Sequence, residues 1–145
     1  MRAVVQRVQH ASVVVGGETM SDIGTGLLVL LGVAASDSTA ECDRLAAKIA
    51  RLRIFEGADG RFDRSLVDVS GGALVISQFT LLADTRKGNR PSFSDAAPPE
   101  VAEPLYERFC DTLGAAGVHV GRGIFGGHMA VSLINDGPVT IVLDA

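Results

Sequence analysis

The residues most suited to chemistry are Ser77, Gln78 and Thr80, three hydrogen-bonding side chains that interrupt the apolar stretch 72–82. The first half of this stretch is rich in aliphatic residues and is typical of a strand buried on both faces. Polar groups at the end of a core strand conflict with burial, and such conflicts often mark functional sites. They are expected where a rigid strand meets the polar loop 83–95, a good place to hold a reacting group. A purely structural role, in which the hydroxyls bond to nearby backbone, remains open from the residues alone.

Outside this stretch, the sequence contains few of the residue arrangements that usually carry catalysis. His10, His119 and His128 are scattered, and a histidine acting as a base needs a nucleophile and an orienting partner within reach. No cluster of His, Cys or carboxylate residues has metal-ligand spacing, so we expect neither a metal nor a cofactor. The backbone N–H groups of Phe79 and Thr80, taken as the end of the strand, are candidate donors to an oxyanion. Thr80 is also a candidate nucleophile, although no base is visible beside it.

Composition narrows the class of protein. A chain of 145 residues fits one domain, residues 1–145, with its own hydrophobic core. The 13 Lys and Arg against 17 Asp and Glu give a net charge of −4, which argues against broad contact with a phosphate backbone. If RNA is the partner, contact should be local, at the end of the molecule. Arg2 and Arg7 break any early apolar run and no segment is long enough to span a membrane, so we expect a cytoplasmic protein.

The elements that must position these residues follow an α+β pattern, with mostly antiparallel strands and two main helices packed to one side. Strands are predicted at residues 3–8, 11–15, 18–23, 26–33, 53–55, 118–120, 129–133 and 139–143, besides the central one. Gly16-Gly17 indicates a hairpin, and Asn135-Asp136-Gly137-Pro138 indicates a turn.

Two helices are predicted from capping residues and apolar spacing. Ser38 and Glu41 have the spacing of a capping box, and an apolar stripe follows them. Pro98-Pro99 opens the second helix, in which apolar residues recur every four positions. Cys42 and Cys110 lie on or beside these stripes, so we expect core packing from them and no reactivity.

Several segments together resemble the D-aminoacyl-tRNA deacylase (D-tyrosyl-tRNA deacylase) family. They are Met-Arg-Ala-Val-Val-Gln-Arg-Val at 1–8, Ser-Gln-Phe-Thr-Leu at 77–81, Asp-Thr-Arg-Lys-Gly-Asn-Arg-Pro-Ser-Phe at 84–93, Ala-Glu-Pro-Leu-Tyr-Glu-Arg-Phe at 102–109 and Asn-Asp-Gly-Pro-Val-Thr at 135–140. The resemblance runs nearly end to end and departs at Gly127, where the family usually has Ala. It implies a barrel-like α+β fold and a hydrolase that removes D-amino acids from the 3′ end of tRNA and rejects L-aminoacyl substrates.

The resemblance also implies the parts of the site. Ser77, Gln78, Phe79 and Thr80 correspond to the family's catalytic segment. Gly137-Pro138 corresponds to a pair with a cis peptide bond, which in the family reaches into the active site of the other subunit of a homodimer. The backbone carbonyls of this pair are expected to block an L side chain, which leaves glycine accepted.

Three roles around this site remain expectations. Arg7 is expected to hold the Gly-Pro loop, with an ordinary edge charge as the alternative. Phe125 and Met129 are expected to line the pocket, as similar positions do in the family. The basic residues of the loop after the strand, Arg86, Lys87 and Arg90, are expected to contact the tRNA, although most such clusters are solvated loops.

Two questions stay open at this point. Water activation by the 2′-hydroxyl of the terminal adenosine is favoured over attack by Thr80. A rival class of protein, a non-catalytic module that binds an RNA end or a small ligand, survives because no classical catalytic side chain is present.

Overall fold

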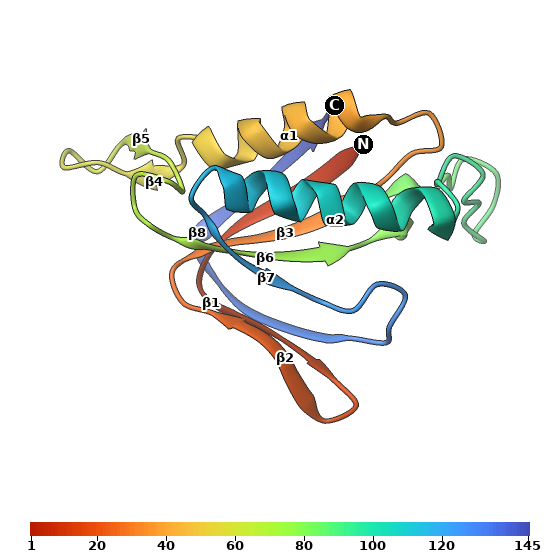
Figure 1. The fold of residues 1–145 in the computed structure, drawn as a ribbon, viewed down its shortest axis with the longest axis horizontal. Helices are drawn as coiled ribbons and strands as arrows, with labels where there is room; N and C mark the ends of the chain where they lie inside the picture. The colour runs from red at the N-terminus through yellow and green to blue at the C-terminus, as the bar shows by residue number, and fades with distance from the viewer.

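Two helices lie side by side on one face of a curved six-stranded sheet in the computed structural model, which describes residues 1–145 (Figure 1). The elements are β1 (Arg2–Val15), β2 (Glu18–Ile23), β3 (Gly26–Gly32), α1 (Thr39–Arg51), β4 (Phe55–Glu56), β5 (Phe62–Arg64), β6 (Gly72–Ser77), the 3-10 turn η1 (Phe79–Leu82), α2 (Pro99–Ala115), β7 (His119–Arg122) and β8 (Ala130–Asp144). A separate small sheet joins β4 and β5.

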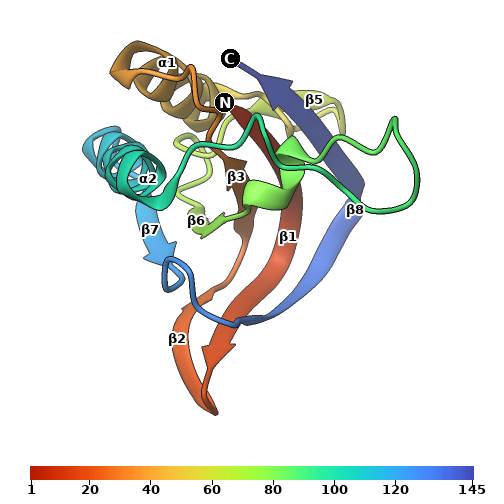
Figure 2. The ribbon, with the colours of Figure 1, turned by 90° about the vertical axis from the view of Figure 1, so that its right-hand side faces the viewer.

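The long strand β1 organises the sheet. It pairs antiparallel with β2, β3 and β8, whereas β6 pairs parallel with both β3 and β7. The sheet curls until it nearly closes into a barrel (Figure 2). The predicted α+β class, with mostly antiparallel pairing and the helices on one side, is confirmed. Because β6 lies between two strands and under the helices, the side chains of Ala73 to Ile76 are buried, as its continuous apolar run predicted.

Two local predictions were wrong. Residues 3–8 and 11–15 form one continuous strand, because β8 pairs along nearly the whole of β1, and the irregularity at residues 6–10 appears only as shifts of register. The segment 135–138 does not end a strand. It lies inside β8, which runs on to Asp144 after the same irregularity.

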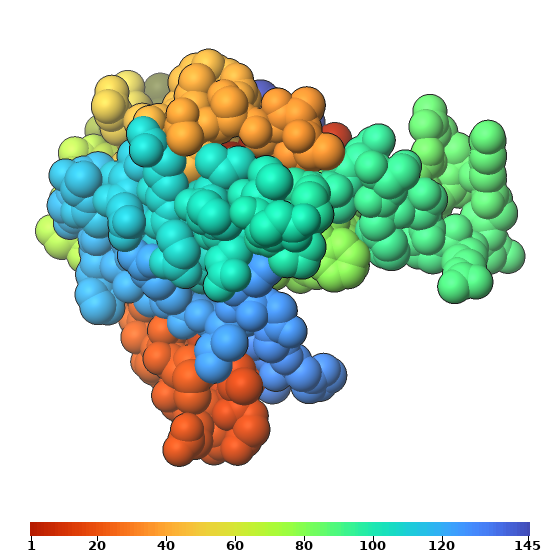
Figure 3. Space-filling view, turned by 45° about the vertical axis from the view of Figure 1, so that its right-hand side comes forward, coloured from red at the N-terminus to blue at the C-terminus, as the bar shows by residue number.

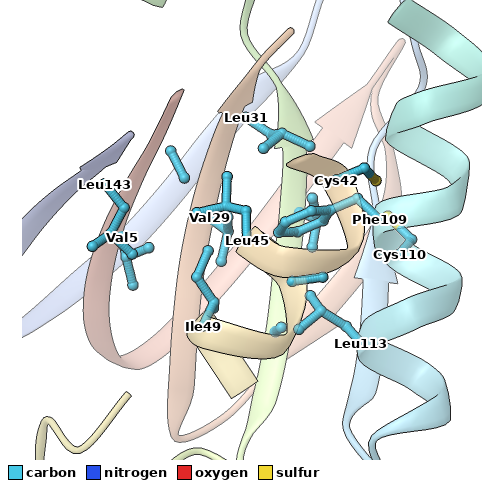
Figure 4. Close-up of a cluster of buried hydrophobic side chains, with 14 of the residues drawn as sticks. Val5, Val29, Leu31, Cys42, Leu45, Ile49, Phe109, Cys110, Leu113 and Leu143 are labelled. Atoms are coloured by element: carbon cyan, nitrogen blue, oxygen red, sulfur yellow. The ribbon is translucent and has the colours of Figure 1, made fainter. Parts of the chain in front are cut away.

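The main core lies between the helices and the sheet (Figure 4). Leu45 and Ile49 of α1 meet Phe109 and Leu113 of α2 over Val29 of β3, and all five side chains are buried. The predicted capping box is present at the start of α1, where Ser38 and Glu41 bond reciprocally. The second helix begins at Pro99 and continues through Pro104.

Both cysteines are free and buried in this core. Burial raises the pKa of the Cys42 thiol to about 11 and that of the Cys110 thiol to about 12. Since the thiolate is the reactive form, neither cysteine is a nucleophile at neutral pH, and the prediction of core packing is confirmed.

Candidate functional site

A cavity of about 500 Å³ lies where β6 ends, bounded by the start of η1, the first turn of α2 and the segment that leads into β8. Its wall is mostly apolar. The polar or aromatic groups that line it are Ser77, Gln78, Phe79, Phe125 and His128, and Met129 lies beside them. The structure therefore brings together three of the four predicted catalytic residues and both predicted pocket residues.

The sequence predicted that Phe79 and Thr80 form the end of the strand. In the structure they begin the turn η1 instead. The strand ends after Gln78 donates its N–H to the Leu31 carbonyl at 2.8 Å, and the Leu81 N–H then closes the turn on the Gln78 carbonyl at 3.2 Å. The first N–H groups of such a turn have no acceptor within it. The N–H groups of Phe79 and Thr80 are therefore the donors that the turn leaves free beside the cavity.

Gly32 on β3 allows this turn to pack closely on the sheet. A Cβ at Gly32 would lie 2.4 Å from Leu82 Cδ2 and 3.0 Å from the Gln78 carbonyl oxygen. A side chain there would push η1 away, so the glycine fixes the depth of the donors relative to β6.

The Thr80 hydroxyl accepts a hydrogen bond from the Gln78 side-chain amide, which is its side-chain partner in the structure. Thr80 is exposed and is not part of the cavity wall. An amide cannot take a proton from a hydroxyl, so this arrangement lacks the base that a nucleophilic threonine requires.

Tyr106 on α2 packs against the cavity wall from the side of the core. It was not identified as a site residue from the sequence. Its ring centroid lies 6.1 Å from that of Phe125, and its hydroxyl donates to the Val75 carbonyl at 2.8 Å. Burial raises the pKa of Tyr106, so the hydroxyl stays protonated and acts as a tether. Its spacing of three from Phe109 and seven from Leu113 places it on the buried face of the helix, a signal that the four-residue pattern overlooked.

Arg7 is buried, so the alternative of an ordinary edge charge is wrong. Its guanidinium donates to the Ile54 carbonyl at 2.7 Å and to the Asp136 carbonyl at 3.0 Å. The Asp136 carboxylate lies 3.2 Å away, and the Phe62 ring lies against the guanidinium. Arg7 therefore holds the backbone immediately before Gly137-Pro138.

Asn135 fixes the same segment from within β8. Its side-chain amide donates to the Arg7 carbonyl at 2.8 Å and to the Val139 carbonyl at 3.0 Å. The peptide bond between Gly137 and Pro138 is cis. Gly137 has φ +152°, and a Cβ there would lie 2.5 Å from the Val139 nitrogen, so this position requires glycine.

Within one chain the two halves of the predicted site lie apart. Arg7 is opposite Leu27 of β3, and Leu27 is opposite Ala73 of β6, whereas the cavity begins at Ile76. Gly137 and Pro138 are thus offset from the cavity by about 10 Å along the strands and by three strand spacings of about 4.8 Å each. Neither residue lines the cavity of its own chain.

The basic loop between η1 and α2 projects from the body of the molecule (Figure 3). Arg86 is paired with Asp84 at 2.6 Å, and this carboxylate raises the pKa of Arg86 while its own pKa falls. Lys87 and Arg90 are exposed and make no ion pair. The Phe93 ring packs edge-on against Phe79 with centroids 5.0 Å apart, which joins the base of the loop to the cavity.

These features belong to a known class of protein. The family model described as D-Tyr-tRNA(Tyr) deacylase matches residues 4–144, and the chain belongs to this family. It is similar to the D-aminoacyl-tRNA deacylase of Roseiflexus castenholzii, with 61% identity over 145 residues that cover 100% of this chain and 92% of the relative. The D-aminoacyl-tRNA deacylase of Ruegeria pomeroyi is 58% identical over 144 residues, 99% of each chain.

Two solved structures share the fold. The c-Myc DNA unwinding element binding protein superposes with a TM-score of 0.93 at 44% identity, covering 100% of this chain and 99% of that one. A probable eukaryotic D-amino acid tRNA deacylase superposes with a TM-score of 0.86 at 18% identity, covering 99% and 98%. Neither helix of the present structure combines the length and apolarity needed to cross a membrane.

Proposed function

We propose that this protein is a hydrolase that cleaves the ester between a D-amino acid and the 3′ end of tRNA, releasing free tRNA and the D-amino acid. The observation that carries the proposal is the full-length membership of the deacylase family, in a chain that retains the cavity at the end of β6. No feature of the chain favours the non-catalytic binding module over this reading. A substrate of this kind agrees with a cytoplasmic location.

The chemistry needs little from side chains. An ester is more reactive than an amide, so its hydrolysis requires a positioned water and donors aimed at the developing oxyanion. The free N–H groups of Phe79 and Thr80 are such donors. The hydrogen bond from Gln78 to Thr80, with no base nearby, supports water activation by the 2′-hydroxyl of the terminal adenosine. Ser77 and Gln78 then hold this adenosine at the cavity.

The rest of the cavity wall suits a nucleobase. Phe125 is held by Tyr106, and Met129 lies on the same side, so the two form an apolar surface for a flat ring. The loop with Lys87 and Arg90, attached beside Phe79, is placed to meet phosphates of the acceptor end. Arg86 contributes less there because Asp84 already neutralises it.

A homodimer completes the site in this proposal, with Gly137 and Pro138 of one chain reaching the cavity of the other. The strand β8 that carries them supports it. β8 pairs only with β1, so its other edge is open, and Leu143 is the only one of its side chains that is buried. Ile134 and Val142 are 56% and 60% exposed on this strand. Long open edges with apolar side chains are usually covered in native proteins.

Selection for the D-form is proposed to come from blocking. The carbonyls of Gly137 and Pro138 occupy the space that an L side chain needs, and such a clash discriminates without affinity for any particular D side chain. Glycine has no side chain to clash, so glycyl-tRNA is also a substrate.

The test is hydrolysis of D-alanyl-, glycyl- and L-alanyl-esters on one tRNA. Rapid release of D-alanine, release of glycine at higher enzyme concentration and a resistant L-ester are expected. If the enzyme releases no amino acid from any of the three, the proposed function is wrong. Strong rejection of glycine beside rapid cleavage of D-alanine would instead overturn the blocking account alone. A tRNA ending in 2′-deoxyadenosine should react slowly, and unchanged rates would exclude the role of the 2′-hydroxyl.

A further inference from the structure

His128 is the one titratable side chain among the residues that line the cavity. In the sequence, none of the three histidines has a nucleophile nearby that would indicate a catalytic base. The structure separates them. His10 is bonded to Asp22 at 2.8 Å and His119 is exposed on β7 away from the cavity, whereas His128 lies on the cavity wall and is exposed. An exposed residue on the wall of a cavity lies at its mouth.

The backbone fixes where His128 can reach. The segment from β7 to β8 makes a tight turn, in which the Gly127 N–H donates to the Ile124 carbonyl at 3.0 Å (Figure 2). Gly126 has φ +73°, and a Cβ at Gly127 would come within 3.2 Å of the Ile124 carbonyl oxygen. The neighbours of His128 on either side of the turn, Phe125 and Met129, both line the cavity. His128 is thus held at the mouth, where its ring can donate a hydrogen bond to a bound molecule.

No Asp, Glu, Lys or Arg side chain lines the cavity beside His128. On the adjoining segments the carboxylates are those of Asp95, Glu100 and Glu103, and none of them lines the cavity. The cation Arg122 is bound by Glu107 and Asp111. Asp22 is engaged with His10. The remaining nearby cations belong to the separate loop around Lys87.

The substrate places an anion at this mouth. When the terminal adenosine enters the cavity, the rest of the tRNA stays outside, so the phosphodiester that links the two must pass through the opening. This argument rests on the proposed function. An imidazole N–H group donates hydrogen bonds to phosphate oxygens.

We propose that His128 binds the phosphate that joins the terminal adenosine of the tRNA to the nucleotide before it. This is a binding role for a part of the substrate that does not react. It requires no proton transfer in the reaction. The effect therefore falls on KM and leaves kcat largely unchanged.

The experiment uses a D-alanyl RNA hairpin with the acceptor-stem sequence, made with either a normal phosphodiester or a neutral methylphosphonate at the last linkage. For the wild-type protein, KM should rise about tenfold with the methylphosphonate. His128→Ala and His128→Gln should bind both hairpins with the same KM. His128→Arg should keep the preference for the phosphodiester.

His119→Ala is the matched control, because it removes an exposed histidine outside the cavity and should retain the wild-type preference. If His128→Ala discriminates between the two hairpins as the wild type does, or if the wild type does not discriminate, the proposal is wrong. A wild-type protein that hydrolyses neither hairpin nor D-aminoacyl-tRNA would instead refute the proposed function. Thermal unfolding of each variant shows whether the fold is retained.

Discussion

The cavity at the end of β6 and the Gly137-Pro138 segment of β8 are built in opposite ways. The cavity is open, its wall is mostly apolar, and its donors are backbone N–H groups that a 3-10 turn leaves free. The Gly137-Pro138 segment is held on both sides, by the buried guanidinium of Arg7 and by the side-chain amide of Asn135. One region is built to receive a molecule, and the other to present a fixed backbone shape. Under the proposed function, this difference assigns binding and selection to separate parts of the fold.

The largest effect is expected from removing a donor in the cavity. Phe79→Pro deletes one N–H at the first position of η1, where proline is compatible with a turn. Loss of one oxyanion donor should lower kcat by about 100- to 1,000-fold. Thr80→Ala is the contrasting variant and should retain activity within about tenfold, because the proposed mechanism assigns the hydroxyl no nucleophilic role. Single-turnover deacylation measures both. A trapped acyl-enzyme on Thr80, with activity kept in Thr80→Ser and lost in Thr80→Ala, would contradict the account.

Gly137→Ala tests the opposite region. The added Cβ would meet the Val139 backbone nitrogen at 2.5 Å, so the segment must shift. A displacement of about 1 Å at a positioning group should reduce activity by about 100-fold. Gly114→Ala is the control, since that glycine has open space and lies in α2. Unchanged rates and unchanged D/L selectivity in Gly137→Ala would show that this segment does not select substrates.

Much of the framework of the fold could be predicted from the sequence, because it depends on local patterns. The apolar run of β6, the Gly16-Gly17 hairpin and the capping box at Ser38 are each specified by neighbouring residues. The continuity of β1, the turn η1 and the burial of Arg7 could not be predicted, because each depends on a partner far along the chain. His128 was missed because only the fold brings it to the cavity. Tyr106 was missed although its spacing from Phe109 and Leu113 places it on the buried face of α2.

Arg7→Ala tests how much the Arg7 side chain stabilises the Gly137-Pro138 segment. The change leaves the Ile54 and Asp136 carbonyls without their donor, which should lower the free energy of unfolding by about 3 kcal/mol. Arg2→Ala is the matched control, because its pair with Asp144 is exposed and should be worth less than about 1 kcal/mol. Urea unfolding compares the two variants. Equal stabilities would mean that Arg7 is not the anchor of this segment.

The smallest effect concerns the basic loop beside the cavity. Neutralising Lys87 and Arg90 with glutamine should raise KM for aminoacyl-tRNA several-fold and reduce its dependence on salt. Arg86→Gln alone should change KM less, since Asp84 already offsets its charge. If the salt dependence of KM is the same in all variants, the loop is a solvated feature without contact to tRNA.

The most direct test of the central claim, that the two regions meet across a homodimer, is complementation between two inactive variants. In a purified mixed dimer of Phe79→Pro and Gly137→Ala chains, one cavity with intact donors faces an intact Gly137 of the other chain. We predict that this mixed dimer recovers up to half of the wild-type deacylation rate, while each variant alone stays inactive. If the mixed dimer forms and remains as inactive as its parents, or if a monomer carries full activity, the two regions do not form a shared site.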